Sequence, residues 1–184
     1  MAKKKSHAAA TAALQALVDA AVPHRSHTFD AGDGDYGAHA AEQLYQLLNI
    51  NSNQIFKTLV IDLTAGKGSR RRLAVAVIPV THSLSLKKAA AAFGVSKATM
   101  ADPADAQRSS GYIPGGISPI GQKRALPTMI DSSAQNFATI FVSGGRRGLD
   151  IELAPSDLAS VTGAGFADLL AAGGASKSNG KPLS

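Results

Sequence analysis

The sequence has no cysteine at any of its 184 positions. This absence excludes disulfide bonds, zinc sites built on cysteine and a cysteine nucleophile. Long apolar runs are also missing: the longest, Leu73 to Val80, has eight residues, whereas a membrane-spanning helix needs about 20. The lysines at 3–5 are followed by Ser6 and His7 rather than by the apolar stretch of a signal peptide. We therefore expect a soluble, cytoplasmic protein with no membrane partner.

Positive charge is in excess, but little of it belongs to the body of the chain. Lys and Arg number 19 against 13 Asp and Glu, a net charge of +6. Five of these basic residues and no acidic residue lie in two tails, 1–6 and 174–184, which leaves +1 for a single domain at 7–173. Aromatic residues make up only 5% of the chain, too few for base-stacking surfaces. Both numbers argue against a general nucleic-acid-binding protein.

Hydrophobic periodicity and helix-breaking residues predict helices and strands in mixed order. The helices are expected at 8–22, 38–48, 85–93, 102–108, from 155 onward and at 166–172. The strands are expected at 27–29, 54–63, 72–80, 126–130, 138–143 and 149–153. Because strands and helices do not alternate regularly, we predict an α/β fold. It is a single compact domain with a mixed, largely antiparallel sheet and flanking helices.

Lys57 is the unusual residue of the strand expected at 54–63. Strict alternation places it on the same face as Leu59 and Ile61, so its ammonium group would lie beside apolar side chains. Such a group must reach water, pair with an acid or bind an anionic ligand. A strand-edge lysine that simply reaches solvent is an equally good interpretation of the residues alone.

Two glycine-rich loops could bring backbone amides close to a ligand. They are Gly115-Gly116-Ile117-Ser118-Pro119 and Ser143-Gly144-Gly145-Arg146-Arg147-Gly148. Amides in such loops can approach a phosphate, a carboxylate or a developing oxyanion. Neither loop fits the Walker or the dinucleotide-binding pattern, and turns that need positive φ are the simpler explanation on spacing alone.

Other polar residues carry weaker signals. Asp150, at the start of a strand, is a candidate partner for a cation or a 2′-hydroxyl, with structural capping an equal alternative. His24 and His27 lie outside a helical pattern and lack a third ligand, so we predict no metal site. No serine has the strand–elbow–helix context of a hydrolase nucleophile. No cofactor is expected.

Five segments taken together resemble the YbaK/EbsC family, the free-standing relatives of the prolyl-tRNA synthetase editing domain. The resemblance extends from about residue 24 to about residue 168. The segments that carry it, in chain order, are Phe56-Lys57-Thr58-Leu59, Leu73–Val77 with Pro79, Ala101-Asp102-Pro103 with Ala106–Ser109 and Gly111-Tyr112, Gly115–Pro119 with Gly121-Gln122-Lys123, and Ser143–Leu153.

This resemblance implies a trans-editing deacylase that removes Cys mischarged on tRNA(Pro) and also acts on Cys-tRNA(Cys). Lys57, Ser143 and Gly145 would be its catalytic residues, with Lys57 matching the family's essential lysine, which helps to hold the 3′ end of the tRNA. The residues expected to bind the substrate are Phe29, Tyr36, Thr58, Gly115, Gly116, Ile117, Ser118, Gly144 and Asp150. The family usually has Tyr at the position of Phe29, and Phe is common at that of Tyr36. The implied partners are mischarged tRNA and prolyl-tRNA synthetase; the oligomeric state is left open.

The chemistry attributed to this family requires little from the protein. The thiol of the esterified cysteine is thought to attack its own ester carbonyl, which yields a cyclic thiolactone and frees the tRNA. Such an enzyme needs no nucleophile and no metal, because it only positions the reacting atoms and stabilises developing negative charge. Intramolecular attack can lower a barrier by ~7–11 kcal/mol.

Two alternatives remain open at this point. One is a water-using deacylase for another mischarged amino acid such as Ala or Ser, which would still act when the substrate has no thiol. The other is a non-catalytic module that binds tRNA or a synthetase. That module would bind tRNA with a steep salt dependence and leave the ester intact.

Overall fold

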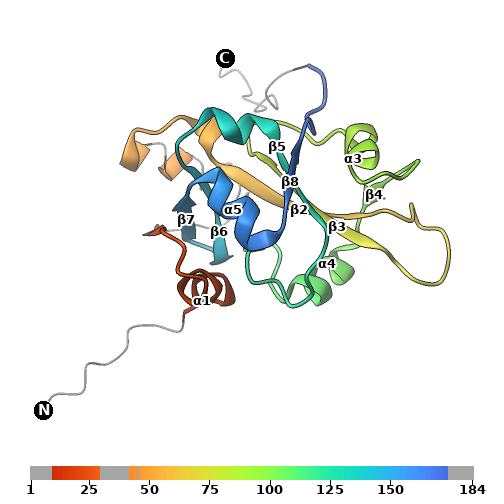
Figure 1. Ribbon diagram of the computed structural model, residues 1–184, viewed down its shortest axis with the longest axis horizontal. Helices are drawn as coiled ribbons and strands as arrows, with labels where there is room; N and C mark the ends of the chain where they lie inside the picture. Colours follow the sequence, from red (N-terminus) through yellow and green to blue (C-terminus); the bar gives the residue numbers. More distant parts are fainter. Residues whose placement is uncertain (1–9, 30–41, 45, 174–184) are drawn as a thin grey trace, which may run out of the picture.

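The computed structural model describes residues 10–29, 42–44 and 46–173, and it contains two β-sheets (Figure 1). The smaller sheet has the strand order β1-β7-β6, formed by Arg25–Thr28, Leu149–Leu153 and Ile140–Arg146. Both of its strand pairs are antiparallel. The β6–β7 connection is the expected tight turn, and a register shift between Ser143 and Arg146 marks a bulge before it.

The larger sheet has five strands in the order β4-β2-β3-β5-β8. Its strands are β2 (Phe56–Asp62), β3 (Leu73–Pro79), β4 (Thr99–Met100), β5 (Thr128–Asp131) and β8 (Gly165–Ala167). The hairpin predicted for β2 and β3 is confirmed, with Lys57 opposite Ile78. Only the β3–β5 and β5–β8 pairs are parallel. The predicted α/β class with mixed, largely antiparallel pairing is therefore confirmed, but the strands are divided between two sheets.

The two sheets are joined at one corner and share a core. An isolated bridge pairs Ile55, just before β2, with Phe141 on β6. Side chains from both sheets, such as Val77 of β3 and Val142 of β6, belong to the same buried cluster. A second cluster, which includes Ile61 and Ala89, fills the space between the larger sheet and α3 (Leu86–Ala92). The corner where the sheets meet is where the cavity described below lies.

The helices begin and end at residues suited to these positions. Thr11 caps α1 (Ala12–Asp19), and the Ser85 hydroxyl accepts from the Lys88 amide at the start of α3. Helix α4 (Pro103–Ser110) has Asp102 as its cap, and α5 (Pro155–Thr162) begins at a proline. Two 3₁₀ turns, Ser52–Gln54 and Ser132–Asn136, complete the connections. None of the described helices has the length and apolar character needed to cross a membrane.

Two expectations about helices are corrected. The helix expected at 166–172 is wrong: Phe166 and its neighbours form β8, which pairs with β5 and places Phe166 against the main core. The Asp131 carboxylate also accepts from the Leu169 amide, which takes up a donor that a helix would have used. The helix expected at 8–22 is shorter because the Thr11 cap fixes its start. The expected loop at 30–37, with Tyr36, lies outside the described residues, and 42–44 and 46–48 are helical.

Candidate active site

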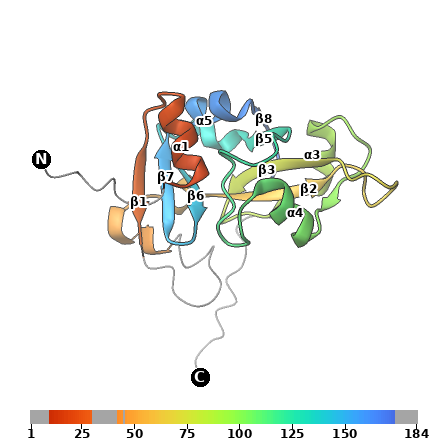
Figure 2. The ribbon, with the colours of Figure 1, turned by 90° about the horizontal axis from the view of Figure 1, so that it is seen from below.

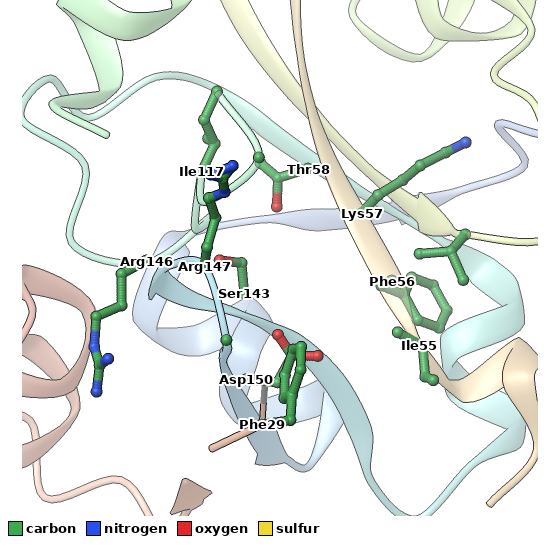
Figure 3. A pocket seen from close by; sticks show the side chains of 13 residues that line it. Phe29, Ile55, Phe56, Lys57, Thr58, Ile117, Ser143, Arg146, Arg147 and Asp150 are labelled. Atoms are coloured by element: carbon green, nitrogen blue, oxygen red, sulfur yellow. The ribbon is translucent and has the colours of Figure 1, made fainter. Parts of the chain in front are cut away.

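A cavity of about 170 Å³ lies where the start of β2, the loop after α4 and the β6–β7 turn come together (Figure 3). Segments far apart in the sequence form its wall. The lining residues are Phe29, Ile55, Phe56, Lys57, Thr58, Val80, Gly115, Ile117, Ser143, Arg146, Arg147, Gly148 and Asp150. A cavity of this size can hold a small ligand group such as an amino-acid side chain.

Asp150 gives the cavity a buried carboxyl group. It is the second residue of β7, directly opposite Ser143 on β6 and His27 on β1, and it is only 8% exposed. No hydrogen bond to its carboxylate is found among the described residues. Burial raises the pKa of Asp150 to about 7, because the charged form is poorly solvated there. The carboxyl group is therefore poised to gain or lose a proton near neutral pH, or to bind a cation.

Thr58 supplies a second unsatisfied polar group. Its Oγ1 is buried, and within the described part of the chain it has no hydrogen-bond partner. A buried hydroxyl without a partner costs about 1–3 kcal/mol, and native structures contain few of them. Because Thr58 lines the cavity, a bound ligand could supply the missing partner.

The position of Lys57 follows from strand alternation. Its neighbours Phe56 and Thr58 face the cavity side of β2, so the lysine leaves the strand on the other side. Figure 3 shows its side chain extending away from Asp150 and Ser143. It nevertheless contributes to the lining at the cavity edge. An ammonium group placed in this way is suited to an anionic group outside the cavity rather than to an ion pair with Asp150.

Glycines allow the two predicted loops to pack together. A Cβ on Gly116 would lie 3.0 Å from the Arg146 Cα, and one on Gly145 would lie 2.6 Å from the Tyr112 ring. The φ of Gly145 is also +99°, a conformation that side chains rarely adopt. The Gly145 amide donates to Ser143 Oγ at 3.2 Å. These close contacts hold the β6–β7 turn against the loop after α4.

His27 is held by a local polar network behind Asp150. Its Nε2 lies 3.0 Å from Glu152 Oε1, and the Thr139 hydroxyl donates to the other Glu152 oxygen at 2.7 Å. Burial raises the pKa of Glu152, but the hydrogen bonds from Thr139 and His27 outweigh this effect and hold the pKa below its usual value. In the described residues no group of three His, Cys, Asp or Glu could hold a metal ion.

The structure brings many of the residues expected at the site into one cavity. These are Phe29, Lys57, Thr58, Gly115, Ile117, Ser143 and Asp150. Others support the cavity without lining it, namely Gly116, Ser118, Gly144 and Gly145. Ser118 is fully buried, and its Oγ accepts from the Ile120 amide. Tyr36 lies outside the described residues.

Sequence reasoning missed part of the wall. Ile55 and Phe56 directly precede Lys57 in the chain, and Val80 donates its amide to the Ile55 carbonyl. The register of the predicted hairpin could have indicated all three. Arg146 and Arg147, noted only as part of a loop, also line the cavity together with Gly148.

Comparisons with known proteins identify the family to which this chain belongs. Residues 35–161 match the model of the aminoacyl-tRNA editing domain. The chain belongs to this editing-domain family. A protein of Enterococcus faecalis provisionally named as the Cys-tRNA(Pro)/Cys-tRNA(Cys) deacylase EbsC is 38% identical over 169 residues, which cover 92% of this chain and 98% of that protein.

Solved structures show the same editing-domain fold. One, provisionally named as a trans-editing enzyme for prolyl-tRNA synthetase, has a TM-score of 0.67 and 24% identity, and covers 80% of this chain and 87% of that one. A second, from work on scaffold proteins for epitope grafting, has a TM-score of 0.72 and 22% identity, with 87% and 95% covered. At these identities the likeness shows the fold alone.

Proposed function

We propose that this chain is a trans-editing deacylase that removes Cys from mischarged tRNA(Pro) and from Cys-tRNA(Cys). The observation that carries the proposal is the small cavity with a buried carboxyl group and a hydroxyl that has no partner among the described residues, in a chain of the editing-domain family. The name of the Enterococcus faecalis relative, which matches along nearly its whole length, supports the choice of amino acid and tRNA.

The proposed reaction uses the substrate's own nucleophile. The cysteine sulfur forms a bond to the ester carbonyl carbon, and the bond from that carbon to the ribose oxygen breaks. The thiol proton ends on the ribose oxygen, so the products are a cyclic cysteine thiolactone and a tRNA with a free hydroxyl. The protein contributes by holding the sulfur near the carbonyl and by excluding alternative conformers.

Each polar group of the cavity has a task in this proposal. Asp150 binds the α-ammonium group of the esterified cysteine or a ribose hydroxyl, and the Thr58 hydroxyl gains a partner from the substrate. Lys57, whose side chain extends away from Asp150, holds the 3′ end of the tRNA outside the cavity (Figure 3). Ser143 and Gly145 fix the turn that forms one wall. Prolyl-tRNA synthetase is the proposed protein partner, consistent with the name of one structural relative.

A second candidate is favoured by one observation. A carboxyl group with a pKa of about 7 can act as a general base toward water at neutral pH. In that case Asp150 would activate water, and the enzyme would hydrolyse Ala or Ser esters that have no thiol.

Three substrates distinguish these candidates: Cys-tRNA(Pro), Ser-tRNA(Pro) and Ala-tRNA(Pro), each with the wild-type protein and with an uncatalysed control. Serine is the matched control because a hydroxyl replaces the thiol at nearly equal size. We expect loss of the Cys ester alone, with cysteine thiolactone as the first product. Loss of all three esters at similar rates would favour the water-using enzyme, and no loss of any would contradict deacylation altogether.

A further inference from the structure

A second concave surface lies on the other side of the loop that follows α4. This cleft has a volume of about 330 Å³. It is lined by Arg70, Arg71, Leu73, Asp105, Arg108, Ser109 and Arg124. Its arginines come from three places: the β2–β3 hairpin, helix α4 and the end of the loop after α4. The sequence shows these residues only as separate basic pairs and runs.

The positive charge of the cleft is only partly neutralised. Arg108 pairs with Asp105 at 2.8 Å, and Arg71 lies 3.7 Å from Asp62. Asp62 is already engaged by the hairpin turn, since its carboxylate accepts from the Thr64 and Gly66 amides. Arg70 and Arg124 have no acidic partner among the described residues, and both are exposed. Four guanidinium groups thus face one carboxylate of the cleft, Asp105.

The cavity and the cleft are lined by two parts of the same loop, the loop after α4. The loop's first part, with Gly115 and Ile117, lines the cavity, and its end folds back onto α4, where the Arg124 amide donates to the Ser109 carbonyl at 3.0 Å. Ile117 packs against a cluster that contains Leu73, a residue of the cleft. Figure 2 shows this segment running between α4 and β6. A ligand long enough to leave the cavity across this loop would reach the arginines.

We propose that the cleft binds the phosphate backbone of the tRNA acceptor stem while the 3′ end occupies the cavity. This inference rests on the proposed function for its choice of RNA. Guanidinium groups match phosphate oxygens in pairs, and exposed arginines on three elements suit a ligand with regularly spaced negative charges. The arrangement also explains how a body with a net charge of only +1 can attract RNA: four of its 14 basic side chains are gathered in one cleft.

The test measures direct binding of RNA to the full-length chain by fluorescence anisotropy, so it does not depend on catalysis. One probe is an uncharged hairpin that reproduces a tRNA acceptor stem with its 3′ end. The other is the single-stranded 3′ end alone. The cleft variant is Arg70→Ala with Arg124→Ala. Its matched control, Lys87→Ala with Lys97→Ala, removes the same charge from two exposed positions outside the cleft.

We expect the cleft variant to weaken hairpin binding by about tenfold or more, and to reduce the slope of log K against log salt by about 2. Binding of the short 3′ end should be unchanged, and the control should bind both probes like the wild type. Arg70→Gln with Arg124→Gln, which keeps the first three side-chain carbons and a polar end but removes the charge, should reproduce the effect and guards against a folding defect in the alanine variant.

Unchanged hairpin binding by both cleft variants would overturn the inference. Equal weakening by the lysine control would also overturn it, because total charge would then be the cause. If the cleft variants bind RNA normally but lose prolyl-tRNA synthetase, the cleft is a protein-docking surface and the inference is wrong. If hairpin binding depends on the cleft but Cys-tRNA(Pro) is not deacylated, the inference is supported and the proposed function alone fails.

Discussion

The cavity and the arginine cleft are lined by different parts of one loop, the loop after α4, but their polar groups differ in how far water reaches them. The cavity holds few polar groups, and burial perturbs them: Asp150 has a pKa of about 7, and the Thr58 hydroxyl has no described partner. The cleft holds several charged groups that stay in contact with water, including Arg70 and Arg124. A buried polar group in the cavity loses free energy when no ligand atom pairs with it. The solvated arginines of the cleft instead attract a negatively charged ligand through their summed charge, and salt screens this attraction.

This difference suggests a division of labour. A small cavity with buried polar groups can distinguish one amino acid from another, because a mismatched ligand leaves buried groups unpaired. A wide, wet cleft cannot make that distinction, but it can raise affinity and association rate for any RNA of the right shape. Substitutions on the two sides should therefore change different kinetic parameters.

The largest expected effect is that of Lys57→Ala. If Lys57 holds the 3′ end so that the ester lies in line for attack, its loss should misplace the reacting atoms and lower the deacylation rate at saturating substrate by about 100-fold or more. The Arg70→Ala/Arg124→Ala variant should instead raise KM and leave kcat nearly unchanged. Single-turnover assays on Cys-tRNA(Pro), with circular dichroism to confirm folding, separate the two patterns. An active, folded Lys57→Ala protein would contradict the assignment.

Asp150→Asn should change how stability depends on pH. The pKa of Asp150 is raised to about 7 in the folded chain, against about 3.9 when unfolded. The folded state thus binds the proton more tightly than the unfolded state does. The contribution of Asp150 to the free energy of unfolding is therefore fully present below about pH 4 and is lost as the pH rises through about 7. The loss is of order 4 kcal/mol at most.

The asparagine variant lacks this titration, so its stability relative to the wild type should increase between pH 4 and pH 8. Urea unfolding of both proteins at several pH values measures the difference. A difference that stays constant over this range would show that the carboxyl group is better solvated than its burial implies.

The smallest expected effect is that of Thr58→Val. This change removes a buried hydroxyl without a described partner at almost constant volume, so the folded protein should gain roughly 1 kcal/mol. Deacylation should nevertheless become slower, because the substrate loses a partner. Thr128→Val is the matched control: its buried hydroxyl donates to the Leu126 carbonyl at 3.0 Å, so that variant should lose stability. Urea unfolding compares the two, and destabilisation of both by the same amount would mean that Thr58 is satisfied in solution.

Local signals made much of the fold predictable. The hairpin of β2 and β3 follows from two β-rich runs around a glycine-containing turn, and the starts of α3 and α4 follow from Ser85 as a cap and from Pro103 in a first turn. These features depend on residues close together in the chain, so short-range patterns suffice. The helix expected at 166–172 failed because Gly165–Ala167 pair with β5 as a short edge strand, and a partner strand that far away in the chain leaves no local pattern in the sequence.

The sequence alone determined which residues could do chemistry: it offered Lys57, Asp150 and two glycine loops, and it excluded a cysteine nucleophile in the protein itself. Only the tertiary structure decided how these groups are arranged. It turned Lys57 away from Asp150, buried the Thr58 hydroxyl with no partner in the described part of the chain, and gathered arginines from three segments into one cleft. The physical reason is that burial and solvation depend on what covers a group, and the covering residues come from distant parts of the chain.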